Sequence, residues 1–173
     1  MADRFRKGPH DIRRIEEFDE LDAVDYALLR ELQDDSRQTN RELAAAVHVS
    51  PSTSSERVRA LRETGVIRGY HAEIALEALG RDVQAFTAVT IRPPTRENIE
   101  GFRNWASRLP EVVSMFVVSG ADDFLLHVAV PDTDALYAFV IDRLTERPEI
   151  ADVRTSVVYE HLRRPVLEPL GDR

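Results

Sequence analysis

The order of apolar segments in the second half of this 173-residue chain permits few folds. The segments expected to be strands are rich in Val, Ile, Phe and Leu and cover residues 85–91, 112–118, 123–130 and 153–160. Helical spacing separates the first strand from the second, over residues 95–109, and the third from the fourth, from Asp132 or Thr133 onward. The order βαββαβ predicts a ferredoxin-like domain, in which two helices cover one face of an antiparallel sheet.

The expected third strand is apolar on both of its faces. Alternate residues of a strand point to opposite sides of the sheet. The two sides carry Phe124, Leu126 and Val128 against Leu125, His127 and Ala129. The two helices cover only one side, so a partner has to bury the other. The sequence therefore predicts a homo-oligomer that forms through the sheet.

Three capped helices are expected in the first half of the chain. Their N-terminal signals are Asp22 with Asp25, Thr39 with Glu42 in a capping box, and Ser50 followed by Pro51. Gly65 is placed to end the third helix as a left-handed cap, and residues 66–74 follow as extended chain. Two short helices joined by a brief turn are typical of a helix-turn-helix, and a small helical bundle of another kind is the alternative.

Composition narrows the class of protein. The net charge of −8 is unfavourable for a nucleic-acid partner, but residues 37–71 hold six Arg against three Glu, so one face can be basic. The absence of cysteine excludes disulfides, thiolate metal sites and a cysteine nucleophile. No apolar run approaches the ~18 residues that span a bilayer, and no signal peptide is visible, so we expect a cytoplasmic protein.

These patterns predict an α+β chain with five parts. They are a mobile tail at residues 1–20, a helix-turn-helix domain at 21–74, a linker at 75–83, a ligand-binding and oligomerisation domain at 84–164, and a second tail at 165–173.

Two stretches carry a resemblance to a known family. The first is Leu21-Asp22-Ala23-Val24-Asp25, continued by Ser50-Pro51-Ser52-Thr53 and Gly65-Val66-Ile67-Arg68-Gly69-Tyr70, and the second is Val118-Ser119-Gly120-Ala121-Asp122-Asp123-Phe124. Taken in order, they resemble the Lrp/AsnC family. The resemblance implies a winged-helix-like DNA-binding domain and a ligand-sensing domain. It also implies dimers gathered into octamers or similar rings, amino-acid effectors bound between sensing domains, and a nucleoid-associated regulator of transcription.

The third helix supplies most candidate contacts to double-stranded DNA. The N-terminal residues of a recognition helix reach base edges, where hydroxyls and Arg form hydrogen bonds. The candidates are Arg37, Thr39, Ser50, Ser52, Thr53, Ser55, Arg57, Arg59 and Arg62. Arg57 has an alternative role, an ion pair with an acidic residue of the first helix. Two positions depart from the family pattern: Ser54 where an apolar residue is usual, and Glu56 where a basic residue is frequent.

The turn after the second strand supplies the candidate effector site. Gly120 permits a tight turn whose N–H groups suit a carboxylate, and an aspartate beside it suits an α-ammonium group. The candidates are Ser119, Gly120, Ala121, Asp122, Asp123, Thr155 and Ser156. The expected effector is an amino acid, and we expect no cofactor and no metal.

Two other functions compete with DNA-binding regulation. Sirohaem decarboxylases share the Lrp-like architecture but are enzymes, and they would need His and Arg around a tetrapyrrole. The five histidines here show no clustered spacing in the sequence. A ligand-binding module that has lost DNA affinity is the second alternative, favoured by Ser54 and Glu56. No catalytic triad, metal-ligand spacing or phosphate-binding glycine loop is visible, and we expect no enzymatic activity.

Overall fold

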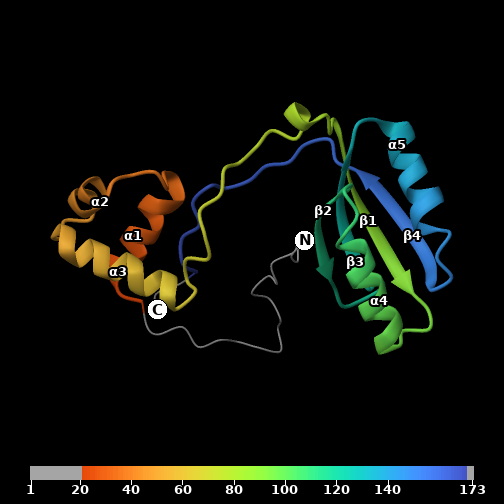
Figure 1. Ribbon diagram of the computed structural model, residues 1–173, viewed down its shortest axis with the longest axis horizontal. Coiled ribbons are helices and arrows are strands. Elements are labelled where there is room, and N and C mark those ends of the chain that lie inside the picture. Colours follow the sequence, from red (N-terminus) through yellow and green to blue (C-terminus); the bar gives the residue numbers. More distant parts are fainter. Residues whose placement is uncertain (1–20, 171–173) are drawn as a thin grey trace. The chain divides into compact units, whose positions relative to one another are not determined.

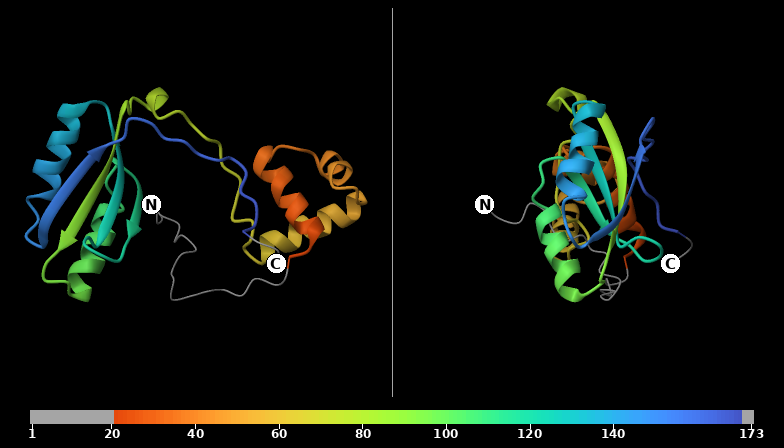
Figure 2. Two further views of the ribbon diagram at one scale, coloured as in Figure 1. Left: turned by 180° about the vertical axis from the view of Figure 1, so that it is seen from behind. Right: turned by 90° about the vertical axis from the view of Figure 1, so that its right-hand side faces the viewer.

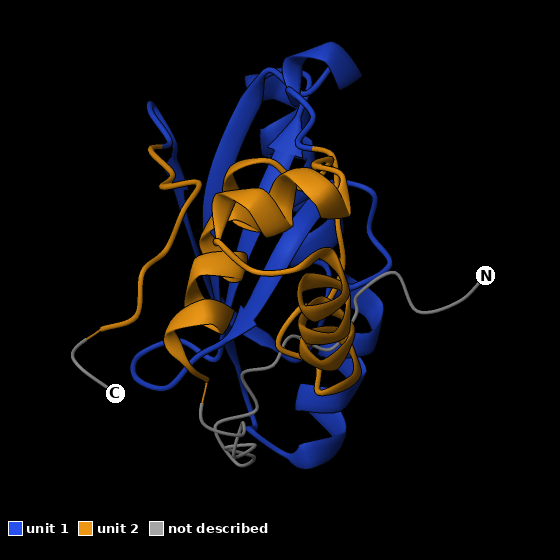
Figure 3. Ribbon diagram, turned by 90° about the vertical axis from the view of Figure 1, so that its left-hand side faces the viewer, with its two compact units in different colours: residues 1–9, 73–161 blue, residues 10–72, 162–173 orange. Residues whose placement is uncertain are grey.

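The computed structural model describes residues 21–170, which form two compact units. The helical unit comprises residues 21–72 with 162–170, and the sheet unit comprises residues 73–161 (Figure 3). The predicted tail at residues 1–20 lies outside the described residues.

The helical unit contains the three helices that the capping signals predict (Figure 1). They are α1 at Ala23–Asp34, α2 at Asn40–Ala46 and α3 at Pro51–Glu63. Asp22 and Thr39 each form a complete capping box, and Ser50 accepts a hydrogen bond from the N–H of Thr53. Gly65 follows α3 with φ +80°, the left-handed conformation expected of it. These local signals therefore fix where each helix begins.

The three helices enclose a small apolar core. Leu28, Leu43 and Leu61 are buried, one from each helix, and Val24, Val47 and Val58 are among the residues that pack around them. Ser54 is also fully buried on α3. The small core therefore includes a buried hydroxyl group.

The expected extended segment at residues 66–74 forms no strand. Extended chain becomes a strand only when another strand pairs with it, and the sheet of the described residues contains only β1 to β4. The linker contains a short 3₁₀ turn, η1 at Glu77–Leu79, which the sequence analysis missed. Gly80 ends this turn with φ +67°.

The sheet unit has the predicted βαββαβ order. Its strands are β1 at Val83–Ile91, β2 at Val112–Val117, β3 at Phe124–Val130 and β4 at Ile150–Val157. Its helices are α4 at Arg96–Ala106 and α5 at Thr133–Ala138, and α5 continues as the π-helical segment η2 at Phe139–Leu144. The sheet order is β2-β3-β1-β4 and every neighbouring pair is antiparallel, as in a ferredoxin-like fold.

The predicted limits of β4 were wrong by three residues at each end. We expected residues 153–160, whereas the strand covers Ile150–Val157. The pairing with β1 explains the difference, since Ile150 lies opposite Ile91 and Val157 lies opposite Ala85.

Both helices of the sheet unit lie on one face of the sheet (Figure 2). The core between them includes Phe102 of α4, Phe124 of β3 and Phe139 of η2, all buried. Phe102 and Phe124 are tilted against each other with ring centroids 4.7 Å apart. No helix of the sheet unit covers the opposite face, which is called the outer face below.

Among the helices of residues 21–170, none combines the length and the apolar character that crossing a bilayer requires.

Candidate nucleic-acid interface and effector site

The helix α3 has one buried side and one exposed side. Ser54 and Leu61 face the core of the helical unit. The exposed side carries hydroxyl, carboxylate and guanidinium groups, those of Ser52, Ser55, Glu56, Arg59 and Arg62. A helix-turn-helix presents such a side of its second helix to the major groove.

Hydroxyl groups gather at the N-terminus of α3. The Oγ of Ser50 accepts a hydrogen bond from the N–H of Thr53 at 3.1 Å, and it lies 2.8 Å from the hydroxyls of Ser52 and Thr53. Thr39 similarly caps α2, and its hydroxyl donates to Glu42 at 2.7 Å. That hydrogen bond is the largest cause of the lowered pKa of Glu42. In contrast, Ser55 has no hydrogen-bond partner for its hydroxyl among residues 21–170.

Three of the candidate arginines extend into solvent. The Arg37 side chain is 92% exposed and lies 3.7 Å from Asp35. The Nε of Arg59 lies 3.9 Å from Glu63, and Arg62 has no ion-pair partner in the described part of the chain. Because such weak exposed pairs contribute little, these guanidinium groups are available to phosphates.

Arg57 adopts the alternative role that the sequence suggested. Its guanidinium group lies 2.5 Å from Asp22 and 3.2 Å from Asp25 at the N-terminus of α1. The two carboxylates raise the pKa of Arg57. The pKa of Asp22 is lowered, first by the N–H of Asp25 and then by Arg57. The ion pairs therefore join α3 to the N-terminus of α1.

Sequence reasoning missed two further contacts of the helical unit. The side-chain amide of Asn40 donates to the carbonyl of Pro51 at 2.7 Å, which joins α2 to the start of α3. The side chain of Gln33 forms two hydrogen bonds with the backbone of Leu167, at 3.0 and 3.2 Å. Neither Asn40 nor Gln33 belongs to a sequence motif, so these two contacts can be recognised only from the folded structure.

The turn between β2 and β3 provides unpaired donors. Gly120 has φ +130°, a conformation that side chains disfavour. The N–H groups of Ser119, Gly120 and Ala121 donate to no residue that the structure describes. Consecutive free N–H groups in a turn suit a carboxylate.

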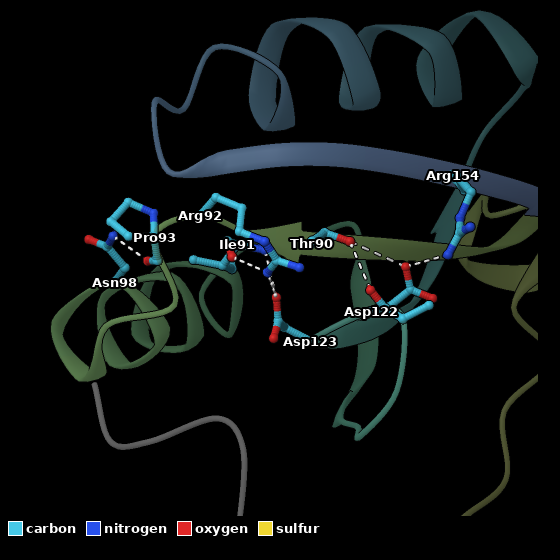
Figure 4. A network of polar contacts seen from close by, with 9 residues as sticks. Thr90, Ile91, Arg92, Pro93, Asn98, Asp122, Asp123 and Arg154 are labelled. Atoms are coloured by element: carbon cyan, nitrogen blue, oxygen red, sulfur yellow. Dashed lines mark hydrogen bonds and ion pairs between the residues drawn. The ribbon is translucent and has the colours of Figure 1, made fainter.

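Both aspartates beside this turn already have partners (Figure 4). Asp122 accepts a hydrogen bond from Arg154 of β4 at 2.5 Å and from the hydroxyl of Thr90 at 3.4 Å. Asp123 accepts from the N–H of Ile91 at 2.7 Å and lies 3.4 Å from Arg92. Each of these bonds uses one carboxylate oxygen and leaves the other without a partner in residues 21–170.

The two candidate hydroxyls of β4 lie apart from the turn within one copy of the chain. Thr155 is opposite Thr87, with 3.2 Å between their hydroxyl oxygens, and Ser156 is opposite Phe86. The β4 residue that contacts the turn is Arg154, which the sequence analysis did not single out. No local pattern in the sequence marks Arg154, because its contact with the turn depends on the register between β4 and β1.

Two histidines that are distant in sequence meet at the outer face. The His127 ring stacks on Phe86 at 5.2 Å, bonds to Gln84 at 3.0 Å and lies 6.5 Å from the His161 ring. Burial, and then the neighbouring His161, lower the pKa of His127. In the part of the chain that the structure describes, no three His, Cys, Asp or Glu side chains are grouped to hold a metal ion.

Comparison with known proteins assigns each of the two units to a known kind of domain. Residues 21–68 match winged helix-turn-helix DNA-binding domains, and residues 84–166 match the Lrp/AsnC ligand binding domain. The chain is 39% identical to the HTH-type transcriptional regulator AldR of Mycolicibacterium smegmatis over 90% of this chain and 89% of that protein. It is 40% identical to the leucine-responsive regulatory protein of Rhizobium meliloti, over 83% and 92% of the two chains.

A solved structure agrees with this likeness. The crystal structure of a transcriptional regulator from Neisseria meningitidis in complex with L-Met aligns with a TM-score of 0.78 and 33% identity, over 84% of this chain and 94% of the other. A helix-turn-helix joined to a ligand-binding domain defines a DNA-binding transcriptional regulator that responds to a small molecule. The chain belongs to the Lrp/AsnC family of such regulators.

Proposed function

We propose that this chain regulates transcription in response to an amino acid that binds at the turn of residues 119–123. One observation carries the proposal: free N–H groups at residues 119–121 stand next to the part-exposed carboxylates of Asp122 and Asp123 in the same turn. Those two features complement the carboxylate and the ammonium group that every α-amino acid has. A relative is named for its response to leucine, and another is known in complex with L-Met.

Within this site, Asp122 is the better receptor for the ammonium group. Asp123 holds the N–H of Ile91 at the end of β1, and losing that bond would expose a strand terminus. Asp122 instead holds Arg154, whose side chain is 58% exposed and can move aside. Ser156 lies opposite Phe86 on the outer face, and we propose that it reaches the effector across an interface between copies. Thr155 lies opposite Thr87 on the other face, so its proposed contact with the effector needs a different approach.

We propose that the side chains that contact DNA are the exposed ones of the helical unit. Ser52, Ser55 and Arg59 on α3 are the candidates for base edges, while Arg37 and Arg62 are candidates for phosphates. The hydroxyls of Thr39 and Ser50 already cap helices, and the Thr53 hydroxyl lies 2.8 Å from that of Ser50, so these three side chains would have to exchange a hydrogen bond to contact DNA. Arg57 already pairs with Asp22 and Asp25 of the α1 N-terminus, so a DNA contact would compete with these ion pairs.

Dimerisation is proposed to occur through the outer face of the sheet unit. The strand register places Phe86, Phe116 and His127 on this face. Phe86 is 37% exposed and Phe116 is 51% exposed, although both are large apolar side chains. A second copy would remove them from water, and rings of such dimers complete the proposed assembly. For function, we propose a DNA-binding domain at residues 21–74, a linker at 75–83, a ligand-binding domain at 84–164 and a tail at 165–173.

The proposal is tested by binding the full chain to the DNA upstream of its own gene, against scrambled DNA, over a salt series. We expect tighter binding to the native fragment, a fall in affinity with salt, and a shift caused by one member of an amino-acid panel. Isothermal calorimetry with that amino acid should show binding to the parent chain and weakened binding to Asp122→Asn.

Equal affinity for native and scrambled DNA at every salt concentration would favour the ligand-binding module that has lost DNA affinity. Selective DNA binding that no amino acid changes would refute the effector assignment and leave the DNA-binding assignment in place.

A further inference from the structure

The exposed side of α3 carries a carboxylate between its two best base-reading groups. Glu56 lies four residues after Ser52 and three before Arg59, so the three side chains form one stripe of the helix. The buried residues Ser54 and Leu61 define the opposite side. Glu56 therefore approaches DNA whenever α3 enters the groove.

Glu56 has no role within the folded unit. It forms no hydrogen bond or ion pair with any residue that the structure describes. The neighbouring arginines have other carboxylates, since Arg57 binds Asp22 and Asp25, and Arg59 lies 3.9 Å from Glu63. A structural purpose does not account for the charge at this position.

A free carboxylate in a groove lined by phosphates is repelled unless a base donates to it. Cytosine presents an N4 amino donor in the major groove with no acceptor beside it. Adenine presents a donor flanked by the N7 acceptor, while guanine and thymine present acceptors at their exposed positions. Cytosine is therefore the base that best offsets the charge of Glu56.

We infer that Glu56 determines specificity by reading one cytosine in each half-site, which rests on the proposed role of α3 as the recognition helix. Arg59, three residues further along, lies about 4.5 Å from Glu56 along the helix axis. Because Arg pairs with guanine, the operator should carry a cytosine and a guanine one or two base-pair steps apart. The carboxylate also lowers affinity for every duplex that lacks the cytosine.

The test compares base preferences of the full-length parent chain with those of Glu56→Gln, Glu56→Ala and the control Glu97→Gln. Each base pair of the native upstream fragment is varied in turn and the dissociation constants are measured. Glu97 is an exposed carboxylate of α4 in the sheet unit, so this control changes the net charge equally and leaves α3 intact. Circular dichroism establishes that all four proteins keep their helices.

For the parent chain and Glu97→Gln, we expect replacement of one cytosine per half-site to weaken binding about ten-fold. Glu56→Gln should prefer adenine at that position, since Gln pairs with adenine in the major groove. Glu56→Ala should show no preference there, and both variants should bind scrambled DNA more tightly than the parent.

The inference is overturned if Glu56→Gln keeps the base preferences of the parent at every position, including the case in which its affinity rises equally for all duplexes. A parent chain that shows no preference for its native fragment would instead refute the proposed DNA recognition, and the inference with it.

Discussion

The buried hydroxyl of Ser54 gives the sharpest stability prediction. Its side chain is fully buried, and its Oγ has no hydrogen-bond partner in the described residues. An unsatisfied buried hydroxyl costs about 1–3 kcal/mol. Replacing Ser with Ala leaves a void on the order of 10 Å³, and at about 24 cal/mol per Å³ this void costs only about 0.2 kcal/mol. Ser54→Ala should therefore stabilise the helical unit.

Ser55→Ala is the matched control for this variant. Ser55 is the next residue of α3 and is exposed, so its replacement gains only the higher helix propensity of Ala, about 0.5 kcal/mol. Ser54→Ala gains the same propensity and also removes the unsatisfied hydroxyl. We expect it to exceed the control by about 1 kcal/mol or more. In a unit of this size, that difference corresponds to roughly 4–8 °C in Tm.

Hydrogen exchange of the amides of α1 and α3 measures this difference, because it follows the helical unit separately from the sheet unit. Protection of these amides should rise more in Ser54→Ala than in Ser55→Ala, while protection in β1 and β3 stays unchanged. Equal or lower protection in Ser54→Ala would mean that the hydroxyl has a partner, and the reasoning would be wrong.

Three further predictions concern titration and assembly. The pKa of Asp22 is lowered, so the stability that this carboxylate contributes is present above its ordinary pKa of 3.8 and is lost as the pH falls through its lower pKa in the folded protein. Asp22→Asn should reduce this loss of stability in acid titrations followed by circular dichroism. Because the pKa of His127 is lowered from 6.5, its contribution to stability is complete above that value and is lost as acid protonates the half-buried ring. His127→Asn should therefore reduce the difference between urea midpoints at neutral and acid pH. Phe116→Asp should weaken self-association about ten-fold or more, as measured by light scattering, because burying a Phe side chain contributes about 1.5–3 kcal/mol. An unchanged association constant would exclude the outer face as the interface.

The parts of the fold that local chemistry determines could be predicted from the sequence. Asp22, Thr39 and Ser50 cap their helices because each side-chain oxygen satisfies N–H groups only two or three residues away. The alternation in β3 placed Phe124 and His127 on opposite faces for the same reason. Such signals span a few residues and need no knowledge of the tertiary structure.

The contacts at the candidate sites depend on register and could not be predicted in this way. Arg154 reaches Asp122 only because β4 pairs with β1 so that Val153 lies opposite Val89. The pairing of His127 with His161 arises from the path of the chain after β4. A shift of β4 by one residue would turn Arg154 to the other face of the sheet, so these contacts are properties of the whole domain.

Ser54 and Glu56, the two residues at which the sequence analysis noted a departure from the family pattern, affect different properties of the helical unit. Ser54 is expected to lower the stability of the helical unit from inside the core, and Glu56 is proposed to lower affinity for arbitrary DNA from the exposed side. They lie on opposite sides of α3, and because one acts on folding and the other on DNA binding, the two effects are separate free energies that separate experiments measure. On this proposal a single helical unit binds DNA weakly, and several units held together bind it more tightly. Linking binding units multiplies affinity without new contacts, so we propose that an effector controls DNA binding by changing assembly through the outer face.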